Sequence, residues 1–155
     1  MALMILIFRL SPFPETHMPY KLIDHTADTG LDLSGNSLDE LFDDAFHGMM
    51  DVLGLTDVEA EQEDALRIDP SPVDLMLVEW LRELLDRYDR GKFVTASVQI
   101  QEIGEDTGLK STIRGEPYDP SRHKPQTEIK GITYHDLSVR QCNDGSWTGR
   151  VIFDL

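Results

Sequence analysis

One stretch of this sequence carries apolar residues at the spacing of a long, one-sided α-helix. Between Leu38 and Leu53 these residues recur three and four positions apart, which predicts a helix with a single buried stripe. Ser37 is a natural N-cap, Glu40 completes a capping box, and Gly54 ends the pattern. A helix of this kind needs another surface against which to bury its stripe.

A second stretch has the same helical spacing and runs up to Tyr88. We expect Ser71 to cap this helix, with Pro72 at its first position and Asp74 at the capping-box position. Gly91 ends it. The chain therefore offers two amphipathic helices.

The rest of the chain favours short strands, because its apolar residues alternate with polar ones. The acidic residues 57–64 read as a solvated loop, and Asn143–Gly145 (NDG) is a strong hairpin signal. The predicted class is α+β, with two helices packed on a mainly antiparallel β-sheet. The expected strands are Tyr20–Ile23, Leu31–Leu33, Ala65–Ile68, Phe93–Ile103, Leu109–Arg114, Glu128–Tyr134, Leu137–Gln141 and Trp147–Phe153.

The chain length of 155 residues predicts one domain. We interpret residues 1–18 as an N-terminal extension, either poorly ordered or read from a wrong start site, and residues 19–155 as the folded domain. The apolar run Met1–Phe8 is too short to span a bilayer. It also lacks the basic region and the cleavage site of a signal peptide. No membrane association is therefore expected.

The net charge and the cysteine content restrict the kinds of partner and the cellular compartment that we expect for this protein. The net charge of −15 disfavours strong direct binding to nucleic acid, and it suits a basic partner protein or a bound cation. Cys142 is the single cysteine, which excludes an intrachain disulfide and a cysteine-based zinc site. A reducing, cytoplasmic setting fits this composition.

The common catalytic motifs are absent from the sequence. It contains no GxxxxGK[ST], no GxGxxG, no HExxH and no GxSxG. What remains is a set of carboxylates and histidines in unusual places.

The segment DHTADTG places Asp24, His25 and Asp28 close together in one loop. Oxygen-rich groups that converge in a loop suit Ca²⁺ or Mg²⁺. Asp and Thr also order loops by bonding nearby backbone N–H groups. The loop by itself leaves both interpretations open.

The end of the sequence, VIFDL, continues the strand pattern to the last residue. This pattern puts the Asp154 side chain next to the terminal carboxylate of Leu155, and two adjacent negative charges favour a neutralising cation. A hard divalent cation held by Asp28, Asp154 and Leu155 would tether the end of the sheet to the first loop. Both Ca²⁺ and Mg²⁺ take oxygen ligands of this kind, so the residues leave the choice between them open.

The segment EIKGITYH carries a lysine among apolar neighbours, followed by Tyr134 and His135 just before a turn. The default interpretation of Lys130 is a solvated strand lysine. The sharper one is a lysine that approaches a phosphate or an acidic site.

DHTADTG, EIKGITYH and VIFDL, in this order, resemble the characteristic blocks of the archease family. The segments LDELFDDAFHGMMDVLG and DLMLVEWLRELLDRYD support the resemblance, which covers residues 19–155. Two positions depart mildly from the family pattern, Asp24 before the histidine and Gly131 where alanine is common. Neither is a proposed metal ligand.

The resemblance implies a protein that is not itself an enzyme. Archeases are cofactor proteins of the tRNA-splicing RNA ligase, which joins 3′-phosphate or 2′,3′-cyclic-phosphate ends to 5′-hydroxyl ends. That ligase forms a guanylylated histidine with Mn²⁺ and GTP, and the archease promotes this step and multiple turnover. The family's metal site, often occupied by calcium, corresponds to Asp28, Asp154 and Leu155. The resemblance therefore implies Ca²⁺ as the expected ion, with Mg²⁺ and Mn²⁺ as alternatives. Its lysine corresponds to Lys130, and Asp24, His25 and His135 are expected near the same acidic tip.

Two other functions compete with this one. A small metal-dependent phosphoesterase would use Asp28, His25 and Asp154, with open metal positions and a base to activate water. A non-catalytic interaction module would use calcium only to staple its C-terminus.

Overall fold

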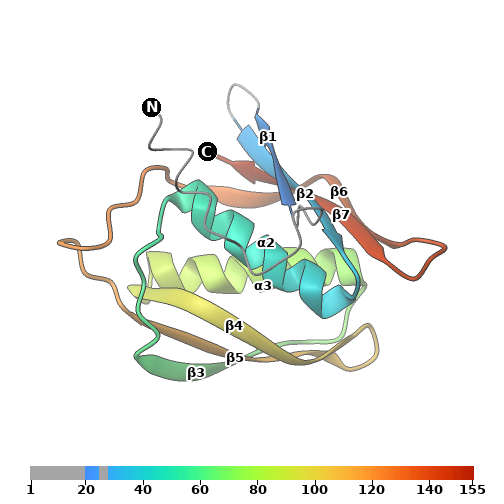
Figure 1. Cartoon of the computed structure of the whole chain (residues 1–155), viewed down its shortest axis with the longest axis horizontal. Coiled ribbons are helices and arrows are strands. Elements are labelled where there is room, and N and C mark those ends of the chain that lie inside the picture. The colour runs from blue at the N-terminus through green and yellow to red at the C-terminus, as the bar shows by residue number, and fades with distance from the viewer. Residues whose placement is uncertain (1–19, 25–27) are drawn as a thin grey trace.

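The computed structural model of the protein describes residues 20–24 and 28–155. The expected extension, residues 1–18, and His25 lie outside the described residues. Two helices lie between a four-stranded sheet and a three-stranded sheet, so the fold has three layers (Figure 1).

The four-stranded sheet joins distant parts of the chain in the order β1-β2-β7-β6, with every neighbouring pair antiparallel. Its inner face carries Leu31 paired with Val151, both fully buried. The strands are β1 (Tyr20–Asp24), β2 (Asp28–Gly35), β6 (Gly131–Gln141) and β7 (Trp147–Asp154).

The three-stranded sheet has the order β3-β5-β4, also antiparallel. Its strands are β3 (Gln62–Ile68), β4 (Phe93–Gly104) and β5 (Gly108–Pro117). Leu109 and Ile113 of β5 lie in the core, and the alternate positions Lys110 and Arg114 are exposed. This alternation is what a sheet with one buried face requires.

Helices α2 (Leu38–Leu53) and α3 (Val73–Asp89) contact both sheets. Their buried side chains form the centre of one continuous core with the inner faces of the sheets. Trp80 of α3 is fully buried, and its indole N–H donates to the carbonyl oxygen of Phe42 in α2 at 3.2 Å. Burying a polar N–H without a partner would cost free energy, so this bond fixes how the helices meet.

The predicted α+β class and the first helix are confirmed. Ser37 is the N-cap, and its hydroxyl accepts the N–H of Glu40 at 3.4 Å. Gly54 ends α2 with a φ of 78°, in the left-handed region that favours glycine. The Glu40 carboxylate accepts the N–H of Asn36 at 3.3 Å.

Several predicted boundaries are wrong. The acidic segment 57–64 is not all loop, because its last three residues begin β3 and pair with β5. Pro72, not Ser71, is the N-cap of α3, and no side chain caps that end. Pro72 has a ψ of 141°, so it is still extended and occupies the N-cap position, and its side chain has no oxygen that could accept an N–H.

The two strands expected at 128–134 and 137–141 are one strand, β6, which begins only at Gly131. The pairing of β6 with β7 is interrupted between Thr133 and Ser138, where the strand bulges. No helix among the described residues is long and apolar enough to cross a membrane.

Candidate functional site

Strands β2 and β7 bring two aspartates together at one end of the four-stranded sheet. Asp28 at the start of β2 pairs directly with Asp154 at the end of β7, and Asp154 pairs on its other side with Gly131 of β6. Directly opposed residues of an antiparallel pair project from the same face, with Cβ atoms about 4.5–5.5 Å apart. We call Asp28, Asp154 and Gly131 the terminal row.

The terminal row joins segments that are far apart in sequence. DHTADTG supplies Asp28, the last strand supplies Asp154, and EIKGITYH supplies Gly131. The backbone N–H of Lys130 donates to the carbonyl oxygen of Asp154 at 2.8 Å. Lys130 is exposed and lies just before β6, so its backbone is fixed at the row while its side chain meets solvent.

One oxygen in the terminal row has no hydrogen-bond partner among the described residues. Oδ1 of Asp28 is buried and makes no hydrogen bond within the described part of the chain. A buried acceptor without a donor is costly, and an opposed carboxylate adds repulsion. The residues therefore fit a hard divalent cation, whose ligands are carboxylate and carbonyl oxygens.

Among the described residues, no three His, Cys, Asp or Glu side chains come together to hold a metal ion. Asp28 and Asp154 supply two carboxylates, and Leu155 follows Asp154 directly. The carboxylate of Leu155 remains the predicted third ligand.

The remaining predicted tip residues are distributed unevenly. Asp24 pairs with Thr29, next to Asp28, so its backbone lies at the same end of the sheet. His135 is exposed and lies beyond the Thr133–Ile152 pair, inside the β6 bulge. Its Nε2 is 3.4 Å from the Asp136 carboxylate. The register therefore does not place His135 in the terminal row.

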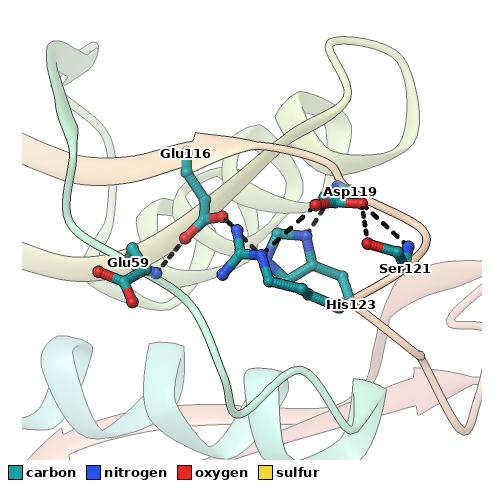
Figure 2. Close-up of polar contacts among 6 residues, drawn as sticks. Glu59, Glu116, Asp119, Ser121 and His123 are labelled. Atoms are coloured by element: carbon teal, nitrogen blue, oxygen red, sulfur yellow. Dashed lines mark hydrogen bonds and ion pairs between the residues drawn. The ribbon is translucent and has the colours of Figure 1, made fainter.

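A buried polar cluster surrounds Glu116, and no sequence pattern indicated it (Figure 2). The Glu116 carboxylate at the end of β5 is 1% exposed, and it accepts the backbone N–H of Glu59 and pairs with the Arg122 guanidinium. Nε2 of His123, itself 2% exposed, lies 3.3 Å from Oε1 of Glu116. The Glu59 N–H and the Arg122 guanidinium satisfy the buried Glu116 charge, and Nε2 of His123 lies beside it without making a hydrogen bond within the described part of the chain.

The tautomer of His123 follows from its other nitrogen. Nδ1 accepts the backbone N–H of Asp119 at 2.9 Å, so the proton of the neutral ring is on Nε2, which faces Glu116 (Figure 2). Asp119 also accepts the N–H and hydroxyl of Ser121, and these bonds lower the pKa of its carboxyl. The groups of this turn are paired with one another, which indicates an anchor rather than a reactive site.

The anchored segment leads directly to the terminal row. Residues 118–130 connect β5 to β6, and Lys130 is the last of them. Past His123, the N–H of Gln126 donates to the carbonyl oxygen of Leu53 at 2.8 Å, and Ile129 is buried. Contacts at His123, Gln126 and Ile129 therefore fix the position of this segment before it reaches Lys130. Histidine and arginine in a proline-rich loop follow no period, so no sequence pattern could have revealed this.

The fold and the terminal row define a small α+β protein with an acidic sheet end. The family model described as the archease protein family (MTH1598/TM1083) matches residues 20–155, and the chain belongs to this family. The structure therefore confirms the fold that the resemblance implied.

Relatives and solved structures agree with this assignment. The protein archease of Methanopyrus kandleri is 33% identical over 143 residues, which cover 89% of this chain and all of the relative. The protein archease of Thermococcus kodakarensis is 31% identical over 85% of this chain and 95% of the relative.

Two solved structures share the fold. The solution structure of Methanobacterium thermoautotrophicum protein 1598 is 31% identical with a TM-score of 0.71, covering 88% of this chain and 99% of that one. The crystal structure of a Thermotoga maritima protein, described as an archease and possible chaperone, is 25% identical with a TM-score of 0.63. The latter covers 90% of this chain and 99% of its own.

Proposed function

We propose that this protein is a non-enzymatic activator of the tRNA-splicing RNA ligase and works through the terminal row. The ligase would join 3′-phosphate or 2′,3′-cyclic-phosphate RNA ends to 5′-hydroxyl ends. The protein would promote guanylylation of the ligase and its return to the active form after each turnover. The family assignment and the description of one relative as a possible chaperone support a role toward another protein.

The terminal row is the observation that carries the proposal. Its register brings the three sequence blocks of the resemblance to one end of one sheet. Asp28, Asp154 and the carboxylate of Leu155 would hold a divalent cation, with Ca²⁺ as the expected ion. When bound, the cation supplies positive charge that neutralises the opposed carboxylates and tethers the end of β7 to β2. The buried Oδ1 of Asp28, which has no hydrogen-bond partner in residues 20–24 and 28–155, is the feature that fits such an ion.

Lys130 would supply the cationic side chain of the tip. Its backbone bond to Asp154 fixes where its side chain emerges, and the side chain is exposed. An ammonium group beside carboxylates suits contact with a nucleotide phosphate or an acidic residue of the ligase.

Net charge supports docking against a basic surface. At −15 the protein would be drawn to a ligase that binds RNA, and this attraction would be screened by salt. We expect activation to weaken steeply between low and high ionic strength. Activation that does not change with salt would contradict electrostatic docking.

The deciding experiment is ligation of a 2′,3′-cyclic-phosphate RNA under multiple turnover with limiting ligase. Wild type should restore turnover, whereas Asp28→Ala and Lys130→Ala should not. Glu63→Ala, which removes an exposed carboxylate on the other sheet, is the matched control and should behave as wild type. Thermal unfolding of each variant establishes that it is folded.

The same variants distinguish the alternatives. If the protein is only an interaction module stapled by calcium, Asp154→Ala should lower its thermal stability, and the wild-type protein should have no effect on ligation. A phosphoesterase would cleave a generic phosphodiester by itself and lose this activity in Asp28→Ala.

A further inference from the structure

The bulge in β6 changes the direction of three side chains next to the terminal row. Between the Thr133–Ile152 and Ser138–Arg150 pairs, β6 has four residues and β7 has one. Asp136 has a φ of 53°, in the left-handed region. Tyr134, His135 and Asp136 are all exposed as a result. Bulges often occur where a strand must present a side chain outward, and a non-glycine residue in the left-handed region is strained.

Tyr134 is the prominent member of this group. It is 55% exposed and is one of three exposed large hydrophobic side chains in the described part of the chain, with Leu22 and Leu75. Its position is three residues beyond Gly131 of the terminal row. A large aromatic surface is therefore presented to solvent beside the candidate site.

An arginine from the neighbouring helix holds this tyrosine in place. Nη1 of Arg82 donates to the Tyr134 hydroxyl at 2.8 Å, and Nη2 donates to the carbonyl oxygen of Ile132 at 3.0 Å. The guanidinium carbon lies 4.8 Å from the centre of the Tyr134 ring. The bond to Ile132 also satisfies a carbonyl on the open edge of β6, and the stacking adds a cation–π contact.

We propose that Tyr134, held by Arg82, is the principal anchor by which this protein binds its partner ligase. Tyrosine and arginine are the residue types that dominate protein–protein binding, and side chains already ordered lose little entropy on docking. The inference rests on the proposed function, since it names the surface that contacts the same partner.

The surrounding charges define the chemistry of the partner surface. Glu79 lies 3.6 Å from Arg82, Asp136 lies beside His135, and the terminal row adds two carboxylates. The complementary surface is an apolar slot for the Tyr134 ring, bordered by basic side chains. An RNA base stacked on the ring would bring phosphates toward these carboxylates, so a protein surface is favoured over RNA.

The test measures binding of this protein to the tRNA-splicing RNA ligase. Tyr134→Ala should weaken binding about 10- to 30-fold, and Tyr134→Phe, which keeps the ring and loses the hydroxyl, about two- to fivefold. Leu75→Ala removes another exposed apolar side chain, from the first turn of α3, and should leave binding unchanged. Thermal unfolding of each variant shows whether it is folded.

Each outcome decides one point. If wild type binds the ligase and Tyr134→Ala binds equally well, the anchor is refuted and the proposed function stands. If the wild-type protein does not bind the ligase, both the anchor and the proposed function are refuted. A single-stranded decauridylate RNA, tested with the isolated protein, completes the set. Binding of this RNA that is lost in Tyr134→Ala, with ligase binding unchanged, would make the tyrosine an RNA contact and overturn the proposal.

Discussion

Replacing Glu116 by glutamine tests whether the buried cluster is the main anchor of residues 118–130. Both carboxylate oxygens accept hydrogens: Oε1 faces Arg122 and His123, and Oε2 accepts the N–H of Glu59. Whichever way the side-chain amide of the Glu116→Gln variant turned, its NH₂ group would face a donor. Because Glu116 is buried while the Arg122 side chain is 37% exposed, the loss is that of an unsatisfied buried group, about 1–3 kcal/mol. For a chain of this length, that corresponds to a fall in Tm of about 2–12 °C.

Urea and thermal unfolding at neutral pH measure this cost directly. Glu63→Gln is the matched control, because Glu63 pairs with Arg114 at 3.0 Å while their side chains are 59% and 49% exposed. Exposed pairs contribute about 0–1 kcal/mol, so the control should hardly change Tm. If Glu116→Gln and Glu63→Gln destabilise the protein equally, the cluster is not an anchor and our reasoning about it is wrong.

Three further predictions concern the cation, a turn and acid stability. Ca²⁺ at about 100 times its Kd should raise the free energy of unfolding by about 2.7 kcal/mol and Tm by about 5–11 °C. The Asp28→Asn variant should lose most of this shift in Tm. The control Asp57→Asn, at an exposed position, should keep it. The Gly54→Ala variant should have a free energy of unfolding about 1–2 kcal/mol lower, because φ at this position is 78° and the added Cβ would lie 3.0 Å from the Cβ of Gln126. An unchanged midpoint of urea unfolding would refute this. Arg87 lowers the pKa of the Asp64 carboxyl, chiefly by donating a hydrogen bond to it. Asp64 therefore stabilises the folded state at any pH above its unfolded pKa of about 3.9. This contribution is lost as the pH falls through the lower pKa of the folded state. Asp64→Asn should flatten this acid dependence, and identical pH profiles would exclude the contribution.

Periodic features of this protein could be predicted from its sequence. Ser37, Gly54 and the apolar stripe between them specify α2 locally, so sequence and structure agree on its bounds. The turn at Gly145, with a φ of 89°, is likewise encoded by neighbouring residues. Such elements depend on contacts within a few residues.

Elements that depend on distant partners were harder to predict. Gln62, Glu63 and Asp64 look like a solvated loop, and they become a strand because β5 offers a free edge. The division into two sheets also depends on which strands the helices separate, and no single segment encodes this. At the candidate site, the sequence predicts that Asp28 and Asp154 come together around a cation but leaves Asp28 in a loop. The structure places Asp28 in β2, opposite Asp154, and the cation stays a prediction. The Glu116–His123 cluster and the Arg82–Tyr134 contact join segments with no common pattern.

The order β1-β2-β7-β6 also affects when the protein can fold. Strand β2 pairs with β7 (Trp147–Asp154), which lies more than a hundred residues later in the chain. Among the described strands, β6 pairs only with β7. On the ribosome, the three-stranded sheet and both helices are complete before this strand is synthesised. Until then the inner face of β2, with Leu31 and Leu33, lacks its neighbour and is open to misassembly. Closure of the four-stranded sheet and assembly of the terminal row are therefore one late event, and a nascent chain cannot present the acidic tip before it has folded.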